Sequence, residues 1–257
     1  MSFHVLIPAR LASTRLPRKA LAEIGGVPMI VRVSGRAAQS NAASVVVATD
    51  HEDIAAACRE HGVAVVMTSA RHATGTDRIA EAAATLGLSE PDIIVNVQGD
   101  EPMLAPLLID ACARLLESQT SCVMSTAAEP IRRREDFESE HVVKVVLDAK
   151  NRAQYFSRAP IPWPRGAGAR ELGALHTAPL RHVGLYAYRP SFLRQFAELA
   201  VSPLETIEQL EQLRVLWHGE RIAVHVSEGQ AGIGVDTPAD LAEVRALFGS
   251  GHGSGFA

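Results

Sequence analysis

The sequence is poor in aromatic residues and in lysine, and it contains no long hydrophobic run. Aromatic residues make up 5% of the chain and hydrophobic residues 47%, so the core must be mainly aliphatic. The three cysteines, Cys58, Cys112 and Cys122, form no CxxC pair, which argues against a disulfide scaffold or a thiolate zinc site. No apolar run approaches the roughly 20 residues that cross a bilayer, and the N-terminus does not resemble a signal peptide. We therefore expect a cytoplasmic protein that does not associate with membranes.

Several common functional signatures are also missing. The 257 residues carry 25 basic and 29 acidic side chains, a net charge of −4, which argues against nucleic acid as a partner. The basic run 132–134 is followed at once by acidic residues and is typical of a solvated face. The chain lacks a Walker A loop, a GxGxxG fingerprint, a GxSxG elbow and an HExxH helix.

The first 120 residues alternate between apolar strands and amphipathic helices. The strands are apolar without alternation, as in a parallel sheet covered on both faces, and Asp50 is expected to cap the second helix. Strands are expected at residues 3–7, 44–49, 63–67 and 92–97, and helices at 29–40, 51–62, 77–86 and 106–118.

Beyond residue 120 the pattern changes, and a mixed sheet is expected. Strands are expected at 122–127, 142–147, 181–188 and 222–226, and helices at 202–218 and 237–248. Residues 160–179 are rich in proline and glycine and predict a long loop or lid, and the Gly/Ser-rich residues 249–257 predict a flexible tail. We find no interdomain linker, so residues 1–248 are expected to form one domain with two parts, about 1–120 and about 121–248.

A basic loop follows the first strand, at residues 8–19. It contains three arginines, two hydroxyl side chains and Lys19, one of only three lysines among the 25 basic residues. Ligands in open α/β sheets bind beyond the carboxyl ends of the strands, and such a loop could surround a triphosphate with N–H groups, guanidinium forks and one ammonium. A solvated loop with no ligand is the alternative.

Two acidic segments complete the candidate site. In 96–102 (NVQGDEP), Asp100 lies at the tip of an apolar strand, where it could hold a hard divalent cation or simply cap a helix. In 232–241 (GIGVDTPADL), Asp236 could be an ordinary helix cap before Pro238. Together with the basic loop, the two acids predict a metal site.

These segments closely resemble the 3-deoxy-manno-octulosonate (KDO) cytidylyltransferases, also called CMP-KDO synthetases. The resemblance extends from residue 5 to about residue 241, and the combination of NVQGDEP, LEQLR and VDTP is specific. The matching segments are IPARLASTRLPRKAL, VATDHEDIA, ATGTDRIAEA, IVNVQGDEPM, VVKVVLD, YFSRAPIPW, RHVGLYAYR, SPLETIEQLEQLRVLWHG and GVDTPADL.

The resemblance implies an activity, a fold and partners. Such enzymes transfer CMP from CTP to KDO and release pyrophosphate, and the product enters lipopolysaccharide synthesis. The fold is expected to be of the nucleotide-diphospho-sugar transferase type, a Rossmann-like α/β core with a smaller mixed lobe through which two copies form a homodimer. Residues 1–120 would form the nucleotide-binding half, and residues 121–248 the sugar-binding and dimerisation part.

The resemblance also implies roles for individual residues. The nucleotide would be bound by Ala9, Arg10, Ser13, Arg15, Lys19 and the loop from His72 through Gly75 to Arg78. Asp100 and Asp236 would bind Mg²⁺, and Lys19, Arg15 and Asp100 would be catalytic. The sugar pocket would be lined by Gln98, Arg158, His182, Tyr186, Glu211 and Gln212.

Some of these assignments have alternatives. Glu211 could be a surface charge, Tyr186 could be core packing, and His182 could be a structural histidine. The chain departs from the family at Arg18, where glycine is frequent, at 164–179, and in its extended tail. The nearest rival function is a cytidylyltransferase for 8-amino-KDO or sialic acid, and a rival of another class is a non-catalytic nucleotide-binding module.

Overall fold

A computed structural model of the chain describes residues 2–13, 16–165, 178–229 and 231–249. Residues 250–257 of the predicted tail at 249–257, and most of the predicted loop at 160–179, lie outside these residues, whereas Gly249 ends the last helix. No helix in the described ranges is long and apolar enough to span a membrane.

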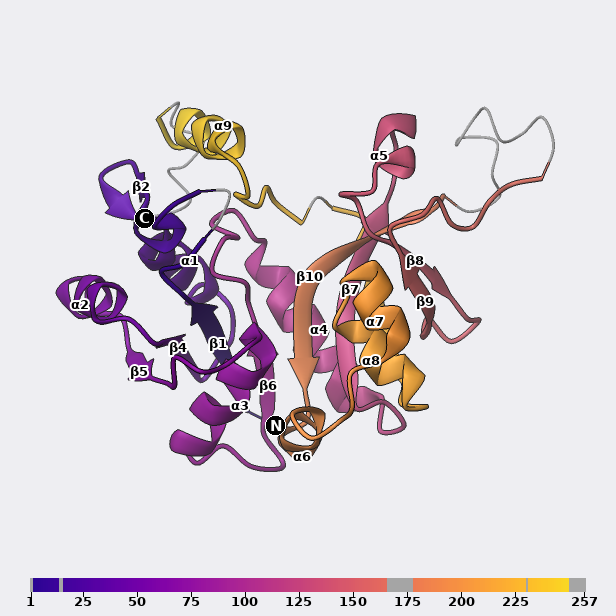
Figure 1. Cartoon of the computed structure of the whole chain (residues 1–257), viewed down its shortest axis with the longest axis horizontal. Coiled ribbons are helices and arrows are strands. Elements are labelled where there is room, and N and C mark those ends of the chain that lie inside the picture. The colour runs from indigo at the N-terminus through magenta and orange to yellow at the C-terminus, as the bar shows by residue number, and fades with distance from the viewer. Residues whose placement is uncertain (1, 14–15, 166–177, 230, 250–257) are drawn as a thin grey trace.

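A mixed sheet runs through both parts of the chain (Figure 1). Its strands lie in the order β11-β7-β10-β6-β1-β4-β5, with β8 paired to β10 and β9 paired to β8. The N-terminal strands are β1 (Phe3–Ala9), β4 (Ser44–Thr49), β5 (Val65–Met67) and β6 (Ile93–Asn96). The later strands are β7 (Met124–Pro130), β8 (Lys144–Leu147), β9 (Ala153–Ser157), β10 (Leu180–Tyr188) and β11 (Ile222–Val226).

The strand directions confirm the expected mixed sheet. Strand β1 pairs in parallel with β4 and β6, and β4 pairs in parallel with β5. Strand β10 is antiparallel to both β6 and β7, whereas β11 is parallel to β7. The β6–β10 pairing joins the two parts of the chain in one sheet, so no linker separates them.

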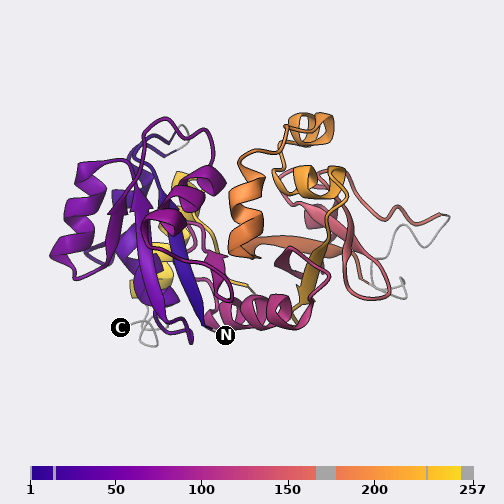
Figure 2. The same cartoon turned by 90° about the horizontal axis from the view of Figure 1, so that it is seen from below.

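Helices cover both faces of this sheet. Helices α1 (Met29–Ala37), α2 (Glu52–Glu60) and α4 (Pro106–Ser118) bury their apolar side chains in one core cluster. Helices α3 (Gly75–Thr85), α6 (Pro190–Phe196) and α8 (Gln212–Trp217) pack in the cluster on the opposite face. Helix α4 contacts β6, β7, β10 and β11, and Figure 2 shows it along the junction of the two parts.

The remaining elements are short, apart from the last helix. These are the 3₁₀ turn η1 (Lys19–Leu21), the hairpin of β2 (Glu23–Ile24) and β3 (Val27–Pro28), α5 (Arg134–Glu138) and α7 (Pro203–Glu208). Helix α9 (Pro238–Gly249) returns to the N-terminal part, where Arg245 donates to the Glu23 carbonyl. The predicted division near residue 120 therefore does not follow the chain to its end.

Three local predictions are corrected by the structure. Helix α2 is capped by His51, whose ring accepts from the Asp53 N–H, while Asp50 instead binds Arg78. The helix expected at 202–218 is broken into α7 and α8, because Gln209 adopts a left-handed conformation with φ +53°. Strand β9 was not predicted, because its five residues show little apolar periodicity.

Candidate functional site

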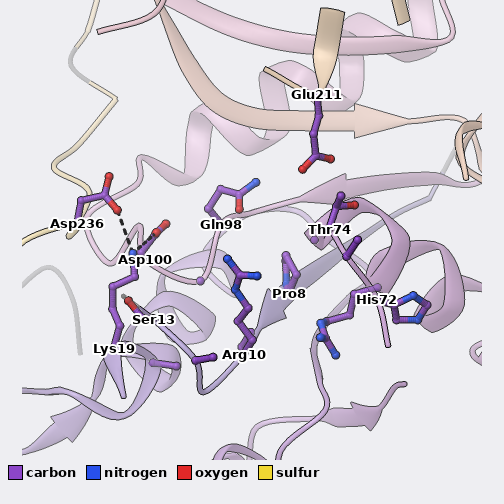
Figure 3. Close-up of a pocket in the computed structure, with 17 residues that line it drawn as sticks. Pro8, Arg10, Ser13, Lys19, His72, Thr74, Gln98, Asp100, Glu211 and Asp236 are labelled. Carbon is purple, nitrogen blue, oxygen red and sulfur yellow. Dashed lines mark hydrogen bonds and ion pairs between the residues drawn. The ribbon is translucent and has the colours of Figure 1, made fainter. Parts of the chain in front are cut away.

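A cavity of about 360 Å³ opens at the carboxyl ends of β1 and β6 (Figure 3). Its wall combines the loop after β1, the start of α3, the turn after β6, and two residues from much later in the chain. The lining residues are Pro8, Ala9, Arg10, Ala12, Ser13, Lys19, Ala20, His72, Ala73, Thr74, Gly75, Arg78, Gln98, Gly99, Asp100, Glu211 and Asp236. We call it the first cavity.

Close backbone packing positions the acidic turn of this cavity. A Cβ atom built on Gly99 would lie 2.9 Å from the Pro8 carbonyl oxygen, a distance that real Cβ atoms essentially never show. Glycine at this position therefore lets the turn after β6 lie directly against the end of β1. As a result, Asp100 lies beside the basic loop that follows β1.

Lys19 links two carboxylates from distant parts of the chain. Its Nζ lies 2.6 Å from Asp100 Oδ2 and 3.1 Å from Asp236 Oδ1 (Figure 3). The Lys19 and Asp100 side chains are 18% and 30% exposed, and the Asp236 side chain is 51% exposed. The two acids therefore converge on one ammonium group at the rim of the cavity.

The segment before Asp236 is held against the acidic turn by its backbone. The Val235 N–H donates to the Asp100 carbonyl at 2.8 Å. Gly232 has φ +116°, and a Cβ on it would lie 2.3 Å from the Met103 carbonyl oxygen, so no other residue fits there without rearrangement. This contact explains how a residue 136 positions after Asp100 reaches the same site.

The charges of this cluster shift one another's pKa values. Burial alone would lower the pKa of Lys19, but the attraction of Asp100, and then of Asp236, outweighs burial and raises it. Burial, reinforced by the Asp100 charge, raises the pKa of the adjacent Glu101 to about 7. The cluster is therefore rich in negative charge, and Lys19 and Arg181 are the cations that act on it.

This donor set fits a hard divalent cation. No group of three or more His, Cys, Asp or Glu side chains is arranged for metal binding in the described ranges, so protein ligands alone do not form a complete cage. Mg²⁺ is usually held by one or two carboxylates and completes its coordination with water and substrate phosphates. Asp100 and Asp236, which both bind Lys19 in this structure, could provide such a pair.

The opposite wall of the first cavity is the loop that leads into α3. Thr74 and Asp77 form a capping box, which fixes the N-terminus of α3 at the cavity. The Arg78 guanidinium is buried and donates to Asp50 and Thr68 at 2.6 Å each. The His72 ring contacts the Glu81 carboxylate. These bonds make this wall a rigid one.

A second cavity of about 220 Å³ continues from the first and shares Gly75, Gln98 and Glu211 with it. In Figure 3, Gln98 lies between Asp100 and Glu211. The other lining residues come from β6, β7, β10, α3, α6 and the α7–α8 region; they are Thr76, Asn96, Met124, Tyr186, Tyr188, Phe196, Gln209, Leu210, Gln212 and Val215. The two cavities are therefore contiguous.

Glu211 lies at the break between α7 and α8. Its carboxylate accepts a hydrogen bond from Thr76 Oγ1 at 2.7 Å, and burial raises its pKa. The break is held by the buried Glu205–Arg214 ion pair, with bonds of 2.7 and 2.5 Å, and by the Glu208 carboxylate. Glu211 is therefore a fixed group of the cavity wall rather than a surface charge.

Comparisons with known proteins identify the family of this chain. A cytidylyltransferase family model matches residues 4–222. The 3-deoxy-manno-octulosonate cytidylyltransferase of Leptothrix cholodnii is 61% identical over 97% of this chain and 92% of its own length. That of Neisseria meningitidis is 57% identical over 96% of this chain and 98% of its own length. This chain belongs to the 3-deoxy-manno-octulosonate cytidylyltransferase family.

Solved structures support the same assignment. A CMP:2-keto-3-deoxy-manno-octonic acid synthetase complexed with CTP has a TM-score of 0.88 and 38% identity over 97% of this chain and 99% of that one. A cytidylyltransferase from Leptospira borgpetersenii, with 19% identity and a TM-score of 0.62, shares the fold. The chain is thus a nucleotidyltransferase with the expected nucleotide-diphospho-sugar transferase type of fold.

The cytidylyltransferase brings most of the predicted site residues together. The first cavity is lined by the predicted Ala9, Arg10, Ser13, Lys19, His72, Gly75, Arg78, Gln98, Asp100, Glu211 and Asp236, and the second by Gly75, Gln98, Tyr186, Glu211 and Gln212. Arg15 lies outside the described residues.

Two predicted sugar contacts of the cytidylyltransferase line neither cavity. The Arg158 side chain donates to the backbone carbonyls of Glu208 and Glu140. His182 is buried, its Nε2 lies 2.9 Å from Thr126 Oγ1, and burial lowers its pKa to about 3, so it is neutral.

Sequence reasoning missed several residues of the enzyme's site. Asn96 lies within the NVQGDEP motif, and Thr76 lies within ATGTDRIAEA, so their motifs were noted without assigning these side chains. Glu101 is adjacent to Asp100, and only its burial sets it apart. Phe196 and Val215 carry no sequence signal, because they line the cavity through the packing of α6 and α8.

Proposed function

We propose that this enzyme transfers CMP from CTP to KDO, releasing pyrophosphate and supplying CMP-KDO for lipopolysaccharide synthesis. One observation carries the proposal most directly. Asp100, Asp236 and Lys19 converge at the rim of a cavity that continues past Gln98 and Glu211 into a second cavity. A nucleotide and a sugar acid bound in the two cavities would meet beside the acidic pair.

The nucleotide would occupy the first cavity. Arg10, Ser13 and Lys19 line this cavity and would bind the phosphates, and Ala9 would contact the nucleotide through its backbone. The loop from His72 to Arg78 would enclose the cytosine, with Arg78 holding the loop rather than the base. Arg15 is proposed to join the phosphate contacts.

The sugar acid would occupy the second cavity. Gln98, Glu211 and Gln212 supply donors and acceptors for hydroxyl groups, and the phenol of Tyr186 donates to Gln212 Oε1 at 3.2 Å. Arg158 and His182 remain predicted contributors to this part of the site. In this structure, Arg158 holds the backbone of the α7–α8 break, and His182 packs beside Tyr186.

The reaction requires the anomeric hydroxyl of the sugar to attack the α-phosphorus in line with the departing pyrophosphate. The protein must mainly position the reactants and neutralise the charge on the phosphate oxygens. Mg²⁺ held by Asp100 and Asp236 would lower the pKa of the attacking hydroxyl and screen the α-phosphate. Lys19 would turn from this acidic pair toward the leaving pyrophosphate, and no protein general base is required.

We also propose that the enzyme is a homodimer formed through residues 121–248. Four large apolar side chains of this part are exposed in the single chain: Trp163, Val201, Ile207 and Trp217. Burial of such side chains is a common basis for self-association. Light scattering coupled to gel filtration should give twice the chain mass, and a single-chain mass would refute this proposal.

A pyrophosphate-release assay with CTP tests the activity. KDO, 8-amino-KDO and sialic acid are compared at equal concentrations, with Mg²⁺ and with a chelator. We expect the highest kcat/KM with KDO and no pyrophosphate release without a divalent metal. A preference for another sugar acid would reassign the substrate, and CTP binding with no turnover on any of the three would support a non-catalytic nucleotide-binding module.

A further inference from the structure

Two polar atoms of the second cavity have no hydrogen-bond partner in the described parts of the chain. They are the side-chain oxygen of Asn96 and the side-chain nitrogen of Gln212. Asn96 is 2% exposed and Gln212 is 4% exposed, so bulk water does not compensate either group. Buried polar groups are nearly always hydrogen-bonded, and each exception calls for an explanation.

The two groups are neighbours in the cavity wall. Asn96 at the end of β6 is paired with Tyr186 on β10, and directly paired residues project from the same face of a sheet. Tyr186 Oη in turn donates to Gln212 Oε1, which leaves Gln212 Nε2 as the free end of that amide. Asn96 and Gln212 thus both adjoin Tyr186, and the Asn96 side chain also interacts with the Tyr188 hydroxyl.

The rest of this cavity limits what the pair can bind. Met124, Phe196, Leu210 and Val215 contribute apolar surface around it. The polar side chains of Thr76, Tyr188, Gln209 and Glu211 also line this cavity, and the two free atoms require a ligand group that both donates and accepts. A hydroxyl group meets this description, because it can donate to Asn96 Oδ1 and accept from Gln212 Nε2.

The positions of Asp100, Gln98 and Asn96 in the two cavities indicate which hydroxyl group of the sugar acid this is. Asp100 lies where the anomeric hydroxyl must react, Gln98 lies at the junction of the cavities, and Asn96 belongs to the second cavity alone. A sugar acid whose anomeric end is at Asp100 therefore extends its opposite end toward Asn96. In KDO the opposite end is the exocyclic chain that carries the terminal hydroxyl at C8.

We propose that Asn96 and Gln212 determine substrate specificity by binding the terminal C8 hydroxyl of the sugar acid. This inference rests on the proposed function. An ammonium group at C8 would satisfy Asn96 but has no lone pair to accept from Gln212, so the pair favours a hydroxyl over an amine. Glu211 attracts an ammonium, but its carboxylate is already an acceptor for Thr76.

The test compares kcat/KM for KDO, 8-deoxy-KDO and 8-amino-KDO. In the unchanged enzyme we expect at least about a 100-fold preference for KDO over 8-deoxy-KDO, because loss of the hydroxyl leaves two buried groups unpaired. Because this arm needs no variant, it is independent of any folding defect. We expect about a tenfold preference for KDO over 8-amino-KDO.

Two near-isosteric variants, Asn96→Leu and Gln212→Met, assign the preference to these residues. Each should lower kcat/KM for KDO at least tenfold, leave or raise that for 8-deoxy-KDO, and leave KM for CTP unchanged. Gln195→Met, at an exposed position on α6, is the matched control and should change none of these values. The CTP constant also verifies that each variant is folded.

The outcomes separate this inference from the proposed function. No pyrophosphate release with KDO in the unchanged enzyme would refute the proposed function itself. Normal activity with KDO, but equal efficiency with 8-deoxy-KDO, would overturn the specificity role alone. A preference for 8-amino-KDO, or variants that lose both substrates equally, would also overturn it.

Discussion

The metal-site hypothesis predicts separate effects on stability and on activity when either Asp100 or Asp236 is changed to Asn. Asn keeps the size of Asp and one carbonyl oxygen, but it removes the negative charge. If the acids are helix caps or simple partners of Lys19, an amide can largely replace them. If the two acids bind Mg²⁺, an amide cannot replace them, because the metal site depends on charged oxygen ligands.

The expected stability change is small. Lys19 retains one carboxylate and one amide oxygen in either variant, and the lost ion pair is partly exposed. Such pairs contribute about 1 kcal/mol. In Asp100→Asn this loss of stability is partly offset, because removing the Asp100 charge also removes its repulsion of Glu101. For a chain of this size, about 1 kcal/mol corresponds to a shift of about 2–4 °C in the thermal midpoint.

The expected activity change is large. Turnover in Mg²⁺ should fall by several decades in each variant, and Mn²⁺, which tolerates neutral ligands better, should restore part of it. The assay is pyrophosphate release at saturating CTP, with the thermal midpoint measured on the same samples. A variant that unfolds, or one that keeps full Mg²⁺-dependent turnover, would show that the residue is structural and that the paired-acid site is misassigned.

Four further changes give distinct outcomes. Lys19→Ala should reduce kcat by about two to three decades while CTP binding, measured by calorimetry, weakens much less, because one preorganised charge is removed; near-normal turnover would contradict its role. Glu211→Ala should raise KM for KDO and spare KM for CTP, and equal losses would place Glu211 in the nucleotide site or the scaffold. Glu101→Gln should remove a pH dependence of unfolding in metal-free buffer. Because the pKa of Glu101 is raised from 4.5 to about 7, the folded state holds a proton between these pH values, and the free energy of unfolding falls by at most about 3 kcal/mol as pH rises through this window. A variant with the same pH profile as the unchanged enzyme would refute the shift. Arg18 has φ +54°, so Arg18→Gly should be about 1 kcal/mol more stable than Arg18→Ala in denaturant unfolding, since both lose the Asp53 pair but only Ala keeps the strain; equal stability would contradict the strain.

Much of the fold was predictable because its determinants are local. Apolar runs such as 44–49 and 92–97 identify the buried strands, and Pro106 and Pro238 lie at the first positions of their helices. The turn after β6 was also predictable as a site, because an acid at the tip of a buried strand is an unusual local pattern. The local signals failed at Gln209, where tertiary packing ends a helix that the sequence continues.

Lys19, Asp100 and Asp236 can be recognised as site residues from the sequence, because each lies in a distinctive motif. Their convergence is not, because it depends on contacts between segments more than 80 positions apart. Arg158 and Asn96 show the same difference between what a motif indicates and what only the folded structure determines. Both lie in recognised motifs, but only packing turns the Arg158 guanidinium toward backbone carbonyls and leaves the Asn96 oxygen unpaired in a cavity. Motifs are set by neighbouring residues, whereas burial and pairing are set by the whole fold.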